Sequence, residues 1–152
     1  MAIKTPKGRI ILFWTAVIVI ILDIATKVWV RSAIPANGSF DILPFLSITH
    51  VQNPGVAFGL LQFASLRWVY VAVALAVAII IANSCRHNKL KSHFLLWGLI
   101  MGGALGNALD RIFIGTVTDF IDFHFWPAFN IADSALTIGI VLLIIHAFRK
   151  EE

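Results

Sequence analysis

The sequence predicts an α-helical integral membrane protein with four transmembrane helices and a small extracytoplasmic β-containing element between the first and second helices. Three observations support this fold class. Of the 152 residues, 59% are hydrophobic and only 13% are charged, four long apolar segments are bounded by charges and turn residues, and the basic residues lie between these segments. Soluble domains usually carry about 25% charged residues. We therefore expect residues 1–152 to form a single four-span membrane domain.

Four apolar segments define the predicted spans, which cover about residues 10–30, 68–84, 94–112 and 130–148. A helix needs about 20 mostly apolar residues to cross a bilayer, and the second and third segments reach this length only with flanking residues. The first segment follows a basic stretch and resembles a secretory signal peptide. It is longer than such a segment and contains Asp23 and Lys27, so we interpret it as a retained span.

The basic residues predict the orientation of the chain. Eight of them would share one side of the membrane: Lys4, Lys7, Arg9, Arg86, Lys89, Lys91, Arg149 and Lys150. The other side would hold only Lys27, Arg31, Arg67 and Arg111. Because basic residues accumulate on the cytoplasmic side, we expect both termini in the cytoplasm. Six acids then fall on the outer side: Asp23, Asp41, Asp110, Asp119, Asp122 and Asp133.

The segment between the first two spans, residues 32–66, has short β-prone runs separated by turn signals at Asn37-Gly38 and Asn53-Pro54-Gly55. It is also rich in apolar residues. We expect a small sheet or an amphipathic element that rests on the bilayer surface.

The third span carries glycines at four-residue spacing, at Gly98, Gly102 and Gly106. Small residues at this spacing let another helix approach closely. We expect Gly98 and Gly102 to serve packing. Gly106 lies beside polar residues and is expected to contribute to a site.

Several polar residues lie within or at the ends of the spans: Asp23, Lys27, Asn107, Asp110, Arg111, Asn130 and Asp133. Charged residues in a membrane are costly and usually functional. Asp23 and Lys27 are four residues apart and can pair on one helix face, either as a structural ion pair or as part of a site. Asn130 is a candidate N-cap for the fourth span. The segment from Asn107 to Arg111 either marks the interface or forms a buried network.

The stretch TDFIDFHFWPAFNIAD, residues 118–133, places Asp119, Asp122 and Asp133 among aromatic residues. Carboxylates in apolar surroundings resist ionisation, and two held together share one proton near neutral pH. Such a pair can activate a water and protonate a leaving amine. The sequence has no G-x-S-x-G or HExxH motif, and its histidines lack metal-ligand spacing. From the residues alone, any two of the three acids qualify.

The order of these motifs resembles the lipoprotein signal peptidases, also called signal peptidase II. The resemblance covers nearly the whole chain. The matching features are Asp23 with Lys27, NPGVAFG at 53–59, GNALDR at 106–111, VTDFIDF at 117–123 and FNIADS at 129–134.

This resemblance implies that Asp119 and Asp133 are catalytic and that Asp122 is supporting or exposed. It implies substrate-binding or site-supporting roles for Asp23, Lys27, Asn53, Gly55, Gly106, Asn107, Asp110, Arg111 and Asn130. The implied reaction is hydrolysis of a prolipoprotein just before a diacylglyceryl-modified cysteine, without a cofactor or metal. The implied location is the bacterial cytoplasmic (inner) membrane, with the active site near its outer face.

Two other functions remain open at this point. A small proton-coupled transporter would also use intramembrane Asp, Lys and Asn residues. The acids lie on the outer side only, however, and no inverted repeat relates the two halves of the chain. A non-catalytic assembly factor would use the acids to hold helices together. The expected partners are prolipoprotein substrates and membrane lipids. Nucleic acid is not expected, because the basic residues form no dense cluster.

Overall fold

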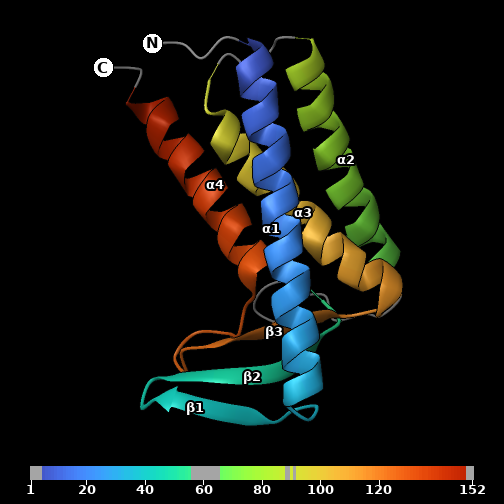
Figure 1. Cartoon of the computed structure of the whole chain (residues 1–152), viewed down its shortest axis with the longest axis vertical. Coiled ribbons are helices and arrows are strands. Elements are labelled where there is room, and N and C mark those ends of the chain that lie inside the picture. The colour runs from blue at the N-terminus through green and yellow to red at the C-terminus, as the bar shows by residue number, and fades with distance from the viewer. Residues whose placement is uncertain (1–4, 56–65, 88–89, 91, 150–152) are drawn as a thin grey trace.

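The computed structural model describes residues 5–55, 66–87, 90 and 92–149, and every structural statement below concerns these residues. Four helices and three strands follow in the order α1 (Thr5–Ala33), β1 (Ser39–Leu43), β2 (Leu46–Asn53), α2 (Arg67–Arg86), α3 (Phe94–Phe113), β3 (Val117–Asp122) and α4 (Ile131–Phe148). The helices form a bundle, and the sheet lies at one end of it (Figure 1). α1 begins and α4 ends at the opposite end of the bundle.

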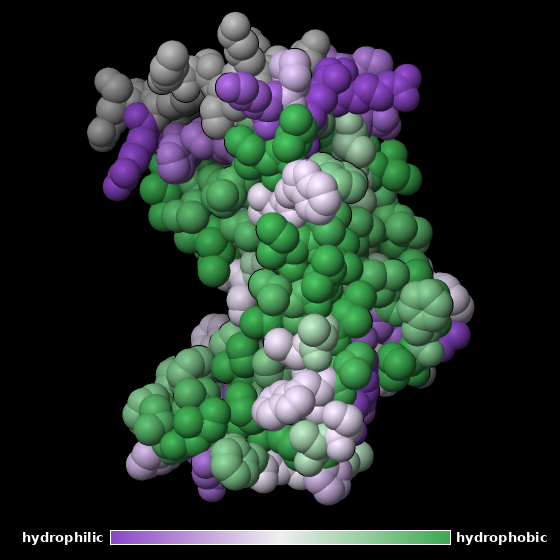
Figure 2. All heavy atoms as spheres, viewed as in Figure 1, coloured by the Kyte–Doolittle hydropathy of each residue, from purple (hydrophilic) through white to green (hydrophobic). Residues whose placement is uncertain are grey.

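Within the described residues, three helices are long and apolar enough to cross a membrane: α1 from Pro6 onward, α2 and α4. α3 is not among them, because glycines and the polar residues Asn107, Asp110 and Arg111 lower its hydropathy. The prediction of four spans is thus supported for three helices, and the span over 94–112 stays a prediction. On the face shown in Figure 2, apolar residues cover most of the helical part, and hydrophilic residues gather where α1 begins.

α3 packs against each of the other three helices, and its glycines allow the close approach. A Cβ atom on Gly98 would lie 2.7 Å from the carbonyl oxygen of Leu12, and one on Gly102 would lie 2.8 Å from the Cβ of Val19. Both glycines therefore pack against α1, which confirms the packing role expected for them. Gly103, the next residue, faces the backbone of α4 instead.

The three strands form an antiparallel sheet in the order β1-β2-β3. β1 and β2 confirm the β-containing element expected between the first two helices. The third strand is a correction to that expectation, because β3 comes from the connection between α3 and α4. Its pairing with β2 places Asn53 opposite Val117 and Val51 opposite Asp119. Local sequence patterns do not reveal a pairing between strands more than 60 residues apart.

Candidate active site

Asn130 connects the two acids that the sequence resemblance singled out. It caps α4: its side-chain oxygen accepts a hydrogen bond from the backbone nitrogen of Asp133 at 2.9 Å, and the Asp133 carboxylate accepts one from the backbone nitrogen of Asn130 at 3.3 Å. The same side chain donates from Nδ2 to Oδ1 of Asp119 at 2.7 Å. The N-cap interpretation of Asn130 is confirmed. One residue, Asn130, therefore bonds the carboxyl groups of both Asp119 and Asp133, through its side chain and its backbone nitrogen respectively.

Asp119 is buried in the middle of β3, with 3% of its surface exposed. Its second oxygen accepts a hydrogen bond from Nδ2 of Asn53 at 2.9 Å, a contact made possible by the pairing of β2 with β3. Burial raises the pKa of Asp119 to about 7, with a further contribution from the nearby charge of Asp133. The hydrogen bonds from Asn53 and Asn130 act in the opposite direction. Near neutral pH this carboxyl is therefore able to hold a proton.

Asp133 lies in the first turn of α4 and is half-buried. It accepts a hydrogen bond from Nδ2 of Asn107 at 2.7 Å. The side-chain oxygen of Asn107 in turn accepts from Nζ of Lys27 at 3.0 Å and from Nδ2 of Asn130 at 3.1 Å. The Lys27 ammonium is a donor only. It therefore fixes which end of the Asn107 amide faces Asp133.

Lys27 belongs to a buried ion network between α1 and α3. Its ammonium lies 2.7 Å from Oδ2 of Asp23 and 3.3 Å from Oδ2 of Asp110. Nη1 of Arg31 lies 3.2 Å from Oδ1 of Asp110. Asp23 and Lys27 are both fully buried. The network places two acids beside two bases, as a buried cluster of charges requires.

Both acids of this network also hold the backbone next to the site. Oδ1 of Asp23 accepts a hydrogen bond from the backbone nitrogen of Ala132 at 2.9 Å, at the start of α4. Oδ2 of Asp110 accepts one from the backbone nitrogen of Thr118 at 3.0 Å, one residue before Asp119. Gly106 leaves the room that Asp23 occupies, because a Cβ there would lie 2.8 Å from Oδ2 of Asp23. The ion network thus positions the two elements that carry Asp119 and Asp133.

Arg111 reaches the site from α3. It is buried, and Nη2 donates to the carbonyl oxygen of Gly55 at 2.6 Å while Nη1 donates to the carbonyl oxygen of Asn107 at 3.3 Å. Its guanidinium lies 5.0 Å above the ring of Tyr70, a cation–π contact. Nε of Arg111 has no hydrogen-bond partner among the described residues. Gly55 is held from its other side, because its nitrogen donates to Oδ1 of Asn53 at 2.9 Å.

The structure separates Asp122 from the other two acids of the stretch 118–133. Asp122 lies three residues after Asp119 on the same strand, so the two side chains point to opposite faces. Its carboxylate accepts a hydrogen bond from the backbone nitrogen of His124 at 2.7 Å. Asp122 thus stabilises a turn, while Asp119 and Asp133 meet at Asn130. The remainder of the family box at 53–59, from residue 56 onward, lies outside the described residues.

Sequence reasoning missed three residues that contact the groups around the acid pair. Arg31 could have been found, because it lies four residues after Lys27 and eight after Asp23 on one face of a helix. Thr118, whose Oγ1 accepts a hydrogen bond from Arg31 at 2.9 Å, carried no signal. Tyr70 lies in the apolar second span, and no motif or spacing in the sequence pointed to its contact with Arg111.

A serine and an aspartate of the sheet also meet a histidine that follows β3, but not as a catalytic triad. Oγ of Ser47 lies 2.6 Å from Oδ1 of Asp41 and 2.7 Å from Nε2 of His124. Because the carboxylate can only accept, the single hydroxyl proton of Ser47 goes to Asp41. His124 must then be the donor in the second contact, and so it cannot act as a base on this serine.

Comparison with known proteins places this arrangement in a family. The family described as signal peptidase (SPase) II matches residues 15–149. The lipoprotein signal peptidase of Paraburkholderia phymatum is 41% identical, over 97% of this chain and 95% of that protein. The one of Yersinia pseudotuberculosis is 38% identical, over 89% of this chain and 85% of that protein.

Solved structures agree with the sequence comparison. A bacterial membrane enzyme solved by the in meso method at 2.3 Å resolution superposes with a TM-score of 0.85 at 32% identity, and the match covers 93% of this chain and 89% of that chain. A second such enzyme, solved at 1.9 Å resolution, gives a TM-score of 0.79 at 34% identity over 90% and 91% of the two chains. With its motifs in order and its fold shared, the chain belongs to the signal peptidase II family.

Proposed function

We propose that this protein is an aspartyl endopeptidase that removes signal peptides from prolipoproteins by hydrolysis just before a diacylglyceryl-modified cysteine. Membership of the family supports a hydrolase that removes signal peptides from lipoproteins. One observation carries the aspartyl mechanism. Asp119 and Asp133, from a strand and a helix, both accept a hydrogen bond from Asn130: Asp119 from its side-chain nitrogen and Asp133 from its backbone nitrogen. Two further asparagines, Asn53 and Asn107, donate to the same two carboxyl groups.

In the proposed reaction the two carboxyl groups hold one proton between them. The ionised acid takes a proton from a water molecule, whose oxygen attacks the carbonyl carbon of the scissile peptide bond. The protonated acid donates a hydrogen bond to the oxyanion and then gives its proton to the departing amine. The raised pKa of Asp119, about 7, suits it to carry the shared proton near neutral pH.

The placement of the acids fits a substrate anchored in the membrane. Asp133 is the third residue of α4, so it lies about 3 Å along the axis from the start of that helix. We place this end near the outer face of the bacterial cytoplasmic membrane, with both termini in the cytoplasm. The bond between a membrane-spanning signal peptide and a lipid-bearing cysteine would lie at the same depth.

The experiment compares Asp119→Asn, Asp133→Asn and Asp122→Asn in purified form on a lipidated precursor peptide. The first two variants should lose at least about 100-fold in cleavage rate, because each removes one member of an acid–base pair. Asp122→Asn is the matched control and should stay active. Normal cleavage by either of the first two variants, or loss confined to Asp122→Asn, would refute the assignment. The thermal midpoint of each variant in detergent shows whether it is folded.

A chelator provides a second test of the mechanism. Two carboxyl groups that activate water directly need no metal ion, so cleavage by the unsubstituted protein should continue at the same rate in EDTA. Loss of cleavage in EDTA and its recovery on adding Zn²⁺ or Mg²⁺ would contradict the proposed chemistry.

A further inference from the structure

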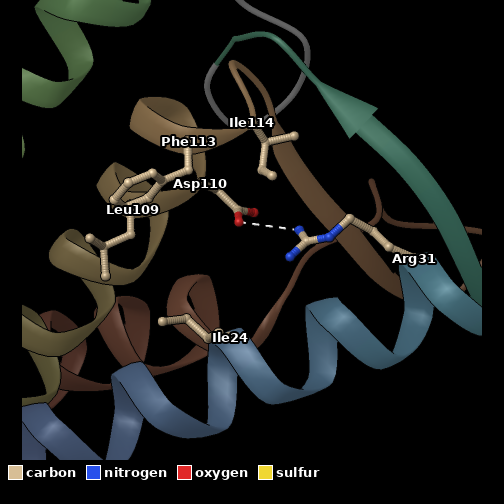
Figure 3. Close-up of a pocket in the computed structure, with 6 residues that line it drawn as sticks. All are labelled: Ile24, Arg31, Leu109, Asp110, Phe113 and Ile114. Carbon is tan, nitrogen blue, oxygen red and sulfur yellow. Dashed lines mark hydrogen bonds and ion pairs between the residues drawn. The ribbon is translucent and has the colours of Figure 1, made fainter.

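A pocket lies between α1 and the end of α3. Its volume is about 190 Å³, and it is lined by Ile24, Arg31, Leu109, Asp110, Phe113 and Ile114 (Figure 3). Neither Asp119 nor Asp133 lines this pocket. Of the residues around the acid pair, it shares only Arg31 and Asp110, which pair with each other.

The walls of the pocket are apolar and reach the surface of the bundle. Phe113, Ile114 and Ile24 are 77%, 50% and 39% exposed. Ile24 belongs to α1, which is long and apolar enough to cross a membrane, so this exposed side chain would meet lipid in a bilayer. A volume of 190 Å³ equals about six water molecules. It is enough for part of one acyl chain and too small for a complete lipid.

One end of the pocket is cationic. Arg31 lies two residues before the end of α1, and 22% of its side chain is exposed. Both of its hydrogen bonds to side chains, to Asp110 and to Thr118, start from Nη1. Figure 3 shows the other terminal nitrogen directed into the pocket. A guanidinium has five N–H donors in a plane that matches the oxygens of a phosphate.

The apolar wall and the cation are arranged along the helix axis like the parts of a lipid. Ile24 and Arg31 are seven residues apart, or about 10 Å along α1. Arg31 is the one nearer to the sheet, because it donates a hydrogen bond to Thr118 of β3. Asp110 also lines the pocket, but Lys27 and Arg31 both contact its carboxylate. Its negative charge is therefore balanced, and it leaves the second terminal nitrogen of Arg31 to another anion.

We propose that this pocket binds one phospholipid of the outer leaflet, with part of an acyl chain against Ile24, Leu109 and Phe113 and a phosphate oxygen on Arg31. The site is separate from the acid pair, so it goes beyond the proposed peptidase function. Binding can be measured without any substrate peptide, so its failure would leave the peptidase assignment untouched.

Native mass spectrometry of the purified full chain in detergent tests the proposal, with dioleoyl phosphatidylglycerol as the probe. The unsubstituted protein should retain one lipid. Arg31→Gln should bind it about tenfold more weakly, because a charge-assisted hydrogen bond is lost. Ile24→Trp fills the pocket without changing charge and should weaken binding to a similar extent. Leu22→Trp is the matched control, because Leu22 is also exposed and lies about 200° around the same helix.

Two further probes distinguish the source of the binding energy. Dioleoylglycerol has the same chains without a phosphate, and inorganic phosphate has no chains; neither should be retained at the same concentration. Equal retention of dioleoylglycerol would overturn the role of Arg31, because that lipid has no phosphate. Displacement of the phospholipid by inorganic phosphate alone would overturn the role of the acyl chain and would make the pocket a simple anion site. Unchanged binding by Ile24→Trp would overturn the location. That variant decides the question even if Arg31→Gln fails to fold.

Discussion

Three asparagine amides hold the carboxylates of this site. Asn53 and Asn130 donate to Asp119, and Asn107 donates to Asp133. An amide is suited to this position because it donates at one end and accepts at the other without adding charge. Asn107 uses both ends, since its oxygen accepts from Lys27. The amides thus orient two acids whose own charges would repel each other.

The raised pKa of Asp119 leads to a prediction for the pH dependence of cleavage. Burial holds this pKa at about 7, so raising the pH through that value removes the proton that the pair shares. The ratio kcat/KM should fall above about pH 7, and fall again in acid when both carboxyls are protonated. A pH profile on a lipidated precursor peptide measures this. A constant rate from about pH 6 to about pH 9 would show that no shared proton is needed.

Lys27 is predicted to stabilise the fold through the charges around it. Lys27→Met leaves Asp23 and Asp110 buried without this partner, and breaking such a buried pair costs about 3–5 kcal/mol. Chemical denaturation in detergent should show that loss in the free energy of unfolding. The double variant Lys27→Met with Asp23→Asn should recover part of it. Lys7→Met, at an exposed lysine of the same helix, is the control and should change little.

At the scale of the elements, neighbouring residues of one strand make contacts on its opposite faces. On β3, Thr118 contacts Arg31 while Asp119 faces Asn53 and Asn130. Successive side chains of a strand point to opposite faces. Thr118 can therefore contact the ion network while the next residue, Asp119, belongs to the acid pair. The linkage explains why β3 is better suited than a helix to carry Asp119.

The close packing of α1 on α3 can be tested at Gly102. Alanine is normally favoured over glycine in a helix by about 1 kcal/mol. Here a Cβ would lie 2.8 Å from that of Val19, so Gly102→Ala should instead lower the free energy of unfolding by about 1–3 kcal/mol. The control is Ala76→Val, an exposed position on α2 where added methyl groups meet only detergent. A stabilised Gly102→Ala variant would show that the helices can separate at little cost.

At the scale of the whole molecule, the buried charged and polar residues of the candidate site gather at one end of the bundle. The acid pair, the ion network and the sheet lie where α1 ends and α4 begins, away from the end where α1 begins. An enzyme that acts on membrane-anchored substrates needs this separation, because water and a polar peptide bond are both present only near the interface. The bundle provides the apolar helices, and the end with the sheet carries the proposed reaction site.

The orientation of the whole molecule is a further prediction. In a Cys85→Ala background, a membrane-impermeant maleimide added to intact spheroplasts should label Phe40→Cys, whose position on β1 is exposed. Lys7→Cys should be labelled only after the membrane is permeabilised. The positive-inside rule gives this expectation. The reverse labelling pattern would place the sheet in the cytoplasm and would rule out the proposed substrate geometry.

The amino-acid sequence alone predicted the four helices and one of the buried ion pairs. Runs of apolar residues predicted the four helices, and the helical bounds extend the predicted 10–30 and 94–112 to Thr5–Ala33 and Phe94–Phe113. The spacing of Asp23 and Lys27 predicted their ion pair. These features depend on residues that are close in sequence, so local patterns contain them.

Tertiary structure decided which acids meet. Asp119, Asp122 and Asp133 were equivalent by spacing, and only the family resemblance distinguished them; in the fold Asn130 contacts the first and the last. The third strand and the pocket beside Arg31 were likewise absent from the sequence pattern. The physical reason is the same in each case. Apolarity and helical period are set by neighbours along the chain, whereas a strand pairing or a shared amide depends on contacts between segments that only folding brings together.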